Sequence, residues 1–279
     1  MVDSIELKDI NLVKKTEAAP KEDAFLVELK RWRSELTKES ICSPYDVWKK
    51  SSELEERMEI SGSDKKLMGV CSSMMELFKD KSRKSGQEYK KQSVIIQQAA
   101  LKEVMSRFRD GKFLDDKAPE YFLAMSEVFA SLKHKGVMNG DDYCLFAGLR
   151  GMISAALLFS TAGFEVELPE VSWDANCDVD LLVSKGGKNF SVSVKSEMGH
   201  HDEYTGEEFT VKTEKRPSDL PQRYYDKYLK HIWINIPSQT TEDGRAFCEQ
   251  SFKARAIGLP SAFMAEYFKM SLGRVRIPE

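Results

Sequence analysis

Acidic and basic side chains recur at a shared spacing in one stretch of the chain, residues 177–197, which reads CDVDLLVSKGGKNFSVSVKSE. Asp178 and Asp180 are two residues apart, and Lys195 and Glu197 repeat that spacing further on. Residues two apart in a β-strand point to the same face, so each pair would share a face. Carboxylates are the ligands that hard divalent cations prefer, and an ammonium group beside them can orient or deprotonate water. The stretch therefore contains the residue types needed to hold a cation and activate a water molecule.

Two apolar runs frame these residues and predict a β-hairpin. Residues 179–183 and 190–194 alternate with period two, and the segment 184–189 between them contains Gly186 and Gly187. Alternation around a Gly-Gly turn is a strong hairpin signal. Folding the hairpin brings the acids of the first strand and the lysine of the second to one end of a sheet.

An acid on one strand, followed across a turn by acid-x-Lys on the next, resembles the motif of the PD-(D/E)XK nuclease superfamily, which has the restriction-endonuclease-like fold. The resemblance implies that Asp180 is the motif aspartate and a metal ligand, and that Lys195 activates water. It also implies Mg²⁺ (or Mn²⁺) as cofactor and hydrolysis of phosphodiester bonds in DNA or RNA. The chain departs from the motif at Ser193, where the acid of acid-x-Lys would fall. We expect Glu197, or alternatively Asp178, to supply the missing carboxylate.

The superfamily often adds a glutamate from its first core helix, and this chain lacks it. The position that aligns is Ser154, and no glutamate occurs in residues 143–162. With Ser193, two acids are absent, so the alternative is a catalytically inactive nuclease-fold protein that binds nucleic acid or acts in assembly. The retained Asp180 and Lys195 favour the nuclease.

Hydrophobic periodicity divides the chain into a helical part and a mixed part. Apolar residues at steps of three and four predict helices over residues 22–39, 45–60, 65–83, 87–109 and 120–135. The pattern changes near 137–140. We therefore expect a flexible arm (1–20), a helical domain (21–138) and a PD-(D/E)XK-like nuclease domain (139–279).

The second part predicts an α-β-β-β-α-β order, which is the order of the superfamily core. The expected elements are a helix over 141–162, a strand over 164–168, a turn over 172–176, the hairpin, a short strand over 207–213, a helix over 222–230 and a strand over 231–236. A helix over 242–256 and a strand over 274–277 follow. The predicted fold class is thus α plus α/β, with a mixed sheet.

Basic and aromatic residues after the hairpin are candidates for nucleic-acid binding, because cations suit backbone phosphates and aromatic rings stack on bases. The candidate residues are Lys212, Lys215, Arg216, Arg223, Tyr224, His200 and His201. The alternative is that the tyrosines pack a helix onto the sheet and that the histidines belong to a polar loop. The lysine-rich points of the helical part, such as residues 79–84 and 90–91, fit either nucleic-acid binding or a solvated helix face.

Composition sets further bounds. The formal net charge of −3 gives no overall basic character, so nucleic-acid contact would come from a local patch. Five scattered cysteines without CxxC spacing indicate neither a disulfide framework nor a zinc site and predict a reducing, cytoplasmic location. The most apolar stretch, residues 152–164, is too short to cross a bilayer, so no membrane partner is expected. A protein partner or self-association through the helical domain stays open.

Overall fold

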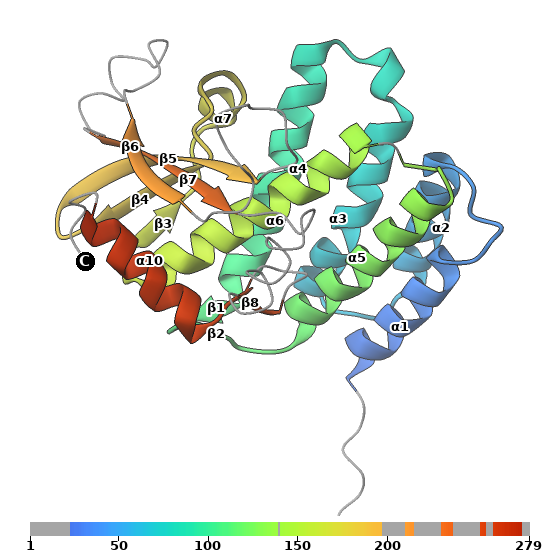
Figure 1. The fold of residues 1–279 in the computed structure, drawn as a ribbon. Coiled ribbons are helices and arrows are strands. Elements are labelled where there is room, and N and C mark those ends of the chain that lie inside the picture. Colours follow the sequence, from blue (N-terminus) through green and yellow to red (C-terminus); the bar gives the residue numbers. More distant parts are fainter. Residues whose placement is uncertain are drawn as a thin grey trace, which may run out of the picture.

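A computed structural model of the 279-residue chain describes residues 23–138, 140–196, 210–214, 230–236, 252–254 and 259–274. The first part is helical, as the periodicity predicts (Figure 1). Its helices are α1 (Ala24–Leu36), α2 (Pro44–Arg57), α3 (Gly62–Lys79), the short 3₁₀ helix η1 (Lys81–Arg83), α4 (Gly86–Ser106) and α5 (Lys117–His134). The five predicted helices are confirmed.

Side-chain caps fix where the first four α-helices begin. Each is preceded by a residue whose side-chain oxygen accepts a hydrogen bond from a backbone N–H of the first turn: Asp23, Ser43, Ser61 and Ser85. Such a cap stabilises a helix by about 1 kcal/mol. The local sequence therefore decides these boundaries.

Five strands in the described residues form one mixed sheet, in the order β3-β4-β5-β7-β6. β5 and β7 are parallel, and the other neighbours are antiparallel. The strands are β3 (Glu165–Glu167), β4 (Leu181–Lys185), β5 (Lys188–Ser196), β6 (Thr210–Glu214) and β7 (Lys230–Ile236). Helix α6 (Gly140–Thr161) precedes the sheet in the chain, and α10 (Ala262–Arg274) follows it. The structure thus combines helices with a mixed sheet, in agreement with the coarse fold prediction.

Helix α6 lies between the sheet and the first helices (Figure 1). It contacts β5 on one side and α4 on another, and Ile153 and Leu157 are fully buried in it. Phe159 of α6 packs edge-to-face against Phe268 of α10, with ring centroids 4.9 Å apart. One hydrophobic core runs from the first helices through α6 into the sheet. The division at residue 138 stays a prediction, and the core is continuous across it.

Four local expectations are wrong. Phe108-Arg109, predicted as a helix end, is strand β1 and pairs with β2 (Lys112–Phe113), because Asp110 and Gly111 both take positive φ and turn the chain. The segment predicted as a turn over 172–176 is helix α7 (Val171–Cys177). Residues 252–254, the part of the predicted helix 242–256 that the structure describes, form β8 and pair with β9 (Leu259–Pro260). Arg274, predicted to begin a strand, ends helix α10.

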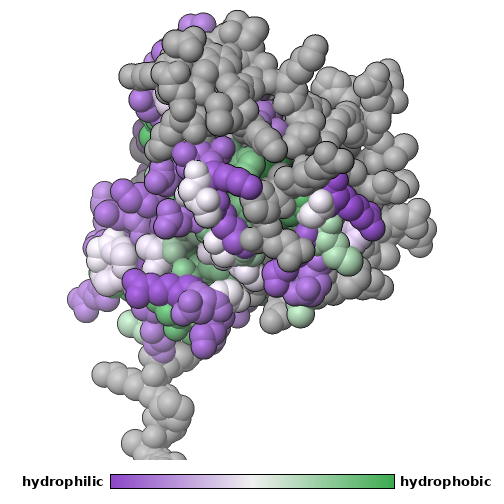
Figure 2. Space-filling model, turned by 90° about the vertical axis from the view of Figure 1, so that its left-hand side faces the viewer, coloured by the Kyte–Doolittle hydropathy of each residue, from purple (hydrophilic) through white to green (hydrophobic). Residues whose placement is uncertain are grey.

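The surface of the sheet side is largely hydrophilic where the structure describes it. Figure 2 shows hydrophobic residues there as small groups between polar ones. No helix among the described residues combines the length and apolar character needed to cross a membrane. The arm over residues 1–20 and all but the last residue of the helix predicted over 222–230 lie outside the described residues. That last residue, Lys230, begins β7.

Candidate functional site

The two faces of the sheet differ in character. Val192 of β5 and Ile232 and Ile234 of β7 belong to the main hydrophobic core, which includes α6. Residues of the other parity lie on the opposite face. They include Ser191, Ser193 and Lys195 on β5 and His231, Trp233 and Asn235 on β7. The parallel register sets Ser191 opposite His231, Ser193 opposite Trp233 and Lys195 opposite Asn235. This opposite face is the polar face of the sheet, and the candidate site lies on it.

Asp180 is fixed at the entry to β4. Its N–H donates to the carbonyl of Val192 at 2.8 Å, and the N–H of Val194 donates to its Oδ2 at 2.6 Å. Burial raises the pKa of Asp180 to about 7, and the negative charge of Asp174 acts in the same direction. The Val194 bond and the positive charge of Lys195 oppose this rise. Asp180 and Lys195, both predicted as site residues, therefore lie within electrostatic reach of each other.

Asp174, which the sequence prediction placed in a turn, is a second buried carboxyl at this site. It lies in α7 with 5% of its surface exposed, and Gln98 of α4 donates to its Oδ2 at 3.0 Å. Burial raises the pKa of Asp174 to about 6. A helix signal was available in Trp173 and Cys177, whose four-residue spacing suits one helix face. The sequence contains no signal for the burial of Asp174, because Gln98 is 76 positions away.

Asp178 lies in a different environment. It ends α7 in the left-handed conformation (φ 50°), which aspartate tolerates better than most residues. Its side chain is 63% exposed, and Oδ1 lies 3.6 Å from Nζ of Lys90 on α4. Of the three aspartates in this segment, Asp174 is buried, Asp180 is partly buried and Asp178 is exposed.

Ser193, which stands where the motif acid would fall, is engaged by neighbouring strands. It is 3% exposed, and its Oγ donates to the carbonyl of Asp178. Since its one proton is used there, Oγ accepts from Nε2–H of His231, at 3.0 Å. In neutral His231, Nδ1 is then the acceptor for the Oγ–H of Ser191 at 2.8 Å. Two serines thus hold His231 between them and tie β5, β7 and the end of α7 together.

The structure also describes Ser154, which stands where the glutamate of the superfamily's first core helix would fall, and Lys212, one of the predicted nucleic-acid-binding residues. Ser154 is buried in α6, and its Oγ donates to the carbonyl of Arg150 at 2.9 Å, so its hydroxyl stays within the helix. Lys212 lies on β6 opposite Trp233. The other predicted residues lie outside the described residues: Glu197, His200, His201, Lys215, Arg216, Arg223 and Tyr224.

The described side chains form no group of three or more His, Cys, Asp or Glu that could hold a metal ion. Asp174 and Asp180 therefore form a pair of carboxyls rather than a complete ligand set. Their oxygens are the donor type that hard cations prefer, and Mg²⁺ is commonly held by one or two carboxylates together with water and substrate phosphates. Both carboxyls are thus of the donor type that such a cation takes.

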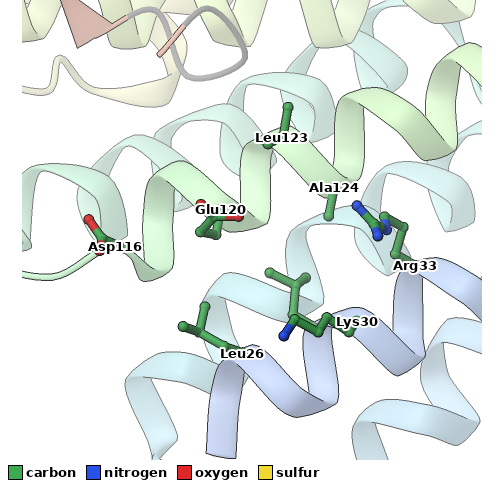
Figure 3. A pocket seen from close by; sticks show the side chains of 8 residues that line it. Leu26, Lys30, Arg33, Asp116, Glu120, Leu123 and Ala124 are labelled. Carbon is green, nitrogen blue, oxygen red and sulfur yellow. The ribbon is translucent and has the colours of Figure 1, made fainter. Parts of the chain in front are cut away.

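A separate hollow lies between α1 and α5, far from these aspartates in the chain, and has a volume of about 300 Å³. Lys30 and Arg33 of α1 line one side, and Asp116 and Glu120 line the other (Figure 3). The two basic and two acidic side chains that line this hollow give it no net charge, and none of the predicted site residues lines it.

Comparison with protein-family models, with curated protein sequences and with solved structures finds no match for this chain. The functional proposal below therefore rests on the residues and their geometry.

Proposed function

We propose that this protein is a metal-dependent nuclease that hydrolyses phosphodiester bonds in nucleic acid, with Asp180, Asp174 and Lys195 in its active site. The observation that carries the proposal is a pair of carboxyls, buried Asp174 and partly buried Asp180, which interact electrostatically where α7 leads into β4. Burial raises the pKa of both, and the charge of Asp174 raises that of Asp180 further. Such perturbed carboxyls cluster at functional sites because they are costly elsewhere.

Neighbouring groups orient both carboxylates. The Val194 N–H holds Oδ2 of Asp180, and the Gln98 amide holds Oδ2 of Asp174. Both residues would hold Mg²⁺ or Mn²⁺, and Glu197 stays the sequence's candidate for a further ligand. The bound ion would supply Lewis acidity toward the phosphate and lower the pKa of a bound water. Lys195, on the same face, would donate a hydrogen bond from Nζ to that water or to a phosphate oxygen.

The fold supports the finer assignment. The described elements include α6, β3, β4, β5 and β7 in the chain order of the α-β-β-β-α-β core, with β6 between β5 and β7, and the sheet is mixed. The second helix of that core is predicted in residues that lie outside the described ranges. Asp180 directly precedes the second of these strands and Lys195 lies near the end of the third, which supports the positions that the resemblance implies.

One observation favours the alternative, a nuclease-fold protein that binds nucleic acid without cutting it. Ser193 is buried and hydrogen-bonded to Asp178 and His231, so its position serves packing and not metal binding. If Asp174 supplies the carboxylate that is missing at position 193, the protein can cut nucleic acid. If it does not, the protein binds without cutting.

Cleavage of labelled single- and double-stranded DNA and RNA, with Mg²⁺ or Mn²⁺ and with EDTA, tests the proposal. We expect metal-dependent cutting by the wild type. Asp180→Asn and Lys195→Met should each reduce the rate at least about 100-fold, the range for loss of a group that holds or moves a proton. Lys102→Met is the matched control, because Lys102 is an exposed lysine on α4. Binding without cutting by the wild type would favour the alternative, and cutting that survives both site variants would refute the assigned residues.

A further inference from the structure

A cleft opens beside the candidate site, between the start of α4 and α7. Its lining residues are Gly86, Gln87, Lys90, Ala175 and Asn176, and its volume is about 300 Å³. That volume is at the lower end of the range of ligand pockets, about 300–1,000 Å³. Ala175 and Asn176 directly follow Asp174 in α7, and the positive charge of Lys90 acts on the Asp174 carboxyl, so the cleft lies within electrostatic reach of that group.

The α4 side of the cleft is positively charged. Residues 79–91 contain six lysines and arginines against two acids, and Lys90 and Lys91 are exposed on α4. Ser85 caps the helix by accepting from the N–H of Glu88, and the first backbone hydrogen bond of the helix is donated by Tyr89. Gly86 and Gln87, both in the cleft lining, come before that ladder, and their backbone N–H groups lie at the positive end of the helix dipole.

Lys90 connects this basic segment with the site. Its Nζ lies 3.6 Å from Oδ1 of Asp178, and both side chains are more than half exposed. An exposed ion pair of this kind is weak, so a phosphate can replace the carboxylate as partner of Lys90. The cleft also contains the amides of Gln87 and Asn176. Lysine, amide side chains and a helix N-terminus are the groups that contact nucleic-acid backbones.

We propose that this cleft binds the phosphodiester backbone of one nucleic-acid strand, with Lys90 as the phosphate-binding residue, next to the carboxyls of Asp174 and Asp180. The inference rests on the proposed function, since it supplies the strand on which the site would act. It assigns a role in substrate binding to the helical part of the chain, which the nuclease resemblance does not cover. Asp178 then acts as a competitor that occupies Lys90 when no strand is bound.

Binding of short fluorescein-labelled oligonucleotides, measured by anisotropy in EDTA at salt concentrations between about 50 and 500 mM, tests this inference without cleavage. The probes are single-stranded DNA, duplex DNA and single-stranded RNA. Lys90→Gln should weaken binding of single strands about fivefold at 0.1 M salt, because losing one phosphate contact lowers the salt slope by about 0.7. Lys102→Gln, the same change at another exposed position of α4, should match the wild type.

Asp178→Asn gives a prediction of opposite sign. Removing the competing carboxylate should tighten binding by about twofold to fivefold, the range that an exposed ion pair is worth. This gain should vanish when Lys90→Gln is also present. A charge effect spread over the whole protein would instead give equal gains in both backgrounds.

Three results would overturn the inference: no binding of any probe by the wild type, equal losses in Lys90→Gln and Lys102→Gln, or an unchanged salt slope in Lys90→Gln. A Lys90-dependent affinity together with no cleavage in Mg²⁺ would refute the nuclease and leave the cleft as a binding site. Cleavage together with unchanged binding by Lys90→Gln would refute the cleft and leave the nuclease.

Discussion

The buried charge of Asp180 should make the protein less stable as pH rises, and removing that charge should reverse the effect. Its pKa rises from an ordinary 3.8 to about 7 on folding. Between these two values the folded state binds a proton that the unfolded state has lost, so the free energy of unfolding falls as pH increases. At 1.36 kcal/mol per pKa unit, the full effect is about 4 kcal/mol, and about 3 kcal/mol of it falls between pH 5 and pH 8.

Asp180→Asn keeps an oxygen that can accept the Val194 N–H and removes the charge. We therefore expect this variant to gain stability relative to the wild type as pH rises, by about 3 kcal/mol more at pH 8 than at pH 5. Urea unfolding in EDTA, followed by tryptophan fluorescence, to which the buried Trp32 contributes, measures the difference at each pH.

Asp178→Asn is the matched control, since it makes the same change two residues away at an exposed position that tolerates asparagine. It should alter the free energy of unfolding by less than about 1 kcal/mol, the value of an exposed ion pair. A difference between Asp180→Asn and wild type that stays constant from pH 5 to pH 8 would refute the assignment of Asp180 as a buried, protonatable group.

Three further predictions concern metal binding by Asp180, the Ser193–His231 hydrogen bond and the buried Asp64–Arg107 ion pair. Mg²⁺ should raise the stability of the wild type at pH 8 by about 1.4 kcal/mol at ten times its dissociation constant and should leave Asp180→Asn unchanged; equal responses in calorimetry would exclude Asp180 as a ligand. Ser193→Ala should destabilise the fold by about 1–3 kcal/mol in urea unfolding, because His231 Nε2–H loses its buried acceptor; a neutral effect would contradict that hydrogen bond. Asp64→Asn should cost about 3–5 kcal/mol, because Arg107 is 8% exposed and loses the carboxylate 2.8 Å away, and an unchanged melting temperature would show that its other contacts suffice.

Features set by neighbouring residues could be predicted from the sequence. The helix starts at Ser43 and Ser61 follow from serine caps, and the hairpin follows from Gly186 and Gly187, which both take positive φ. The turn is tighter than predicted. β4 runs to Lys185 and β5 begins at Lys188, because two consecutive residues with positive φ reverse the chain within a two-residue loop.

Features that depend on distant packing could not be predicted. Asp174 is buried by α4, and His231 meets Ser191 and Ser193 only because β5 and β7 are parallel neighbours in a fixed register. Neither contact has a local signature. Asp180 and Lys195 could be found from the sequence because both belong to one short hairpin. Asp174 could not be found because it is buried by a helix that is distant in the chain.

In the nuclease that we propose, Asp174, and not Asp178, supplies the second carboxylate. The most direct measurement is the rate of Mg²⁺-dependent cleavage of a labelled oligonucleotide by the wild type, Asp174→Asn and Asp178→Asn. Each variant replaces one carboxylate by an amide, and the two positions are four residues apart. We predict that Asp174→Asn lowers the rate at least about 100-fold and that Asp178→Asn still cuts. Loss of cutting in Asp178→Asn with retention in Asp174→Asn, or no cutting by the wild type, would contradict the account.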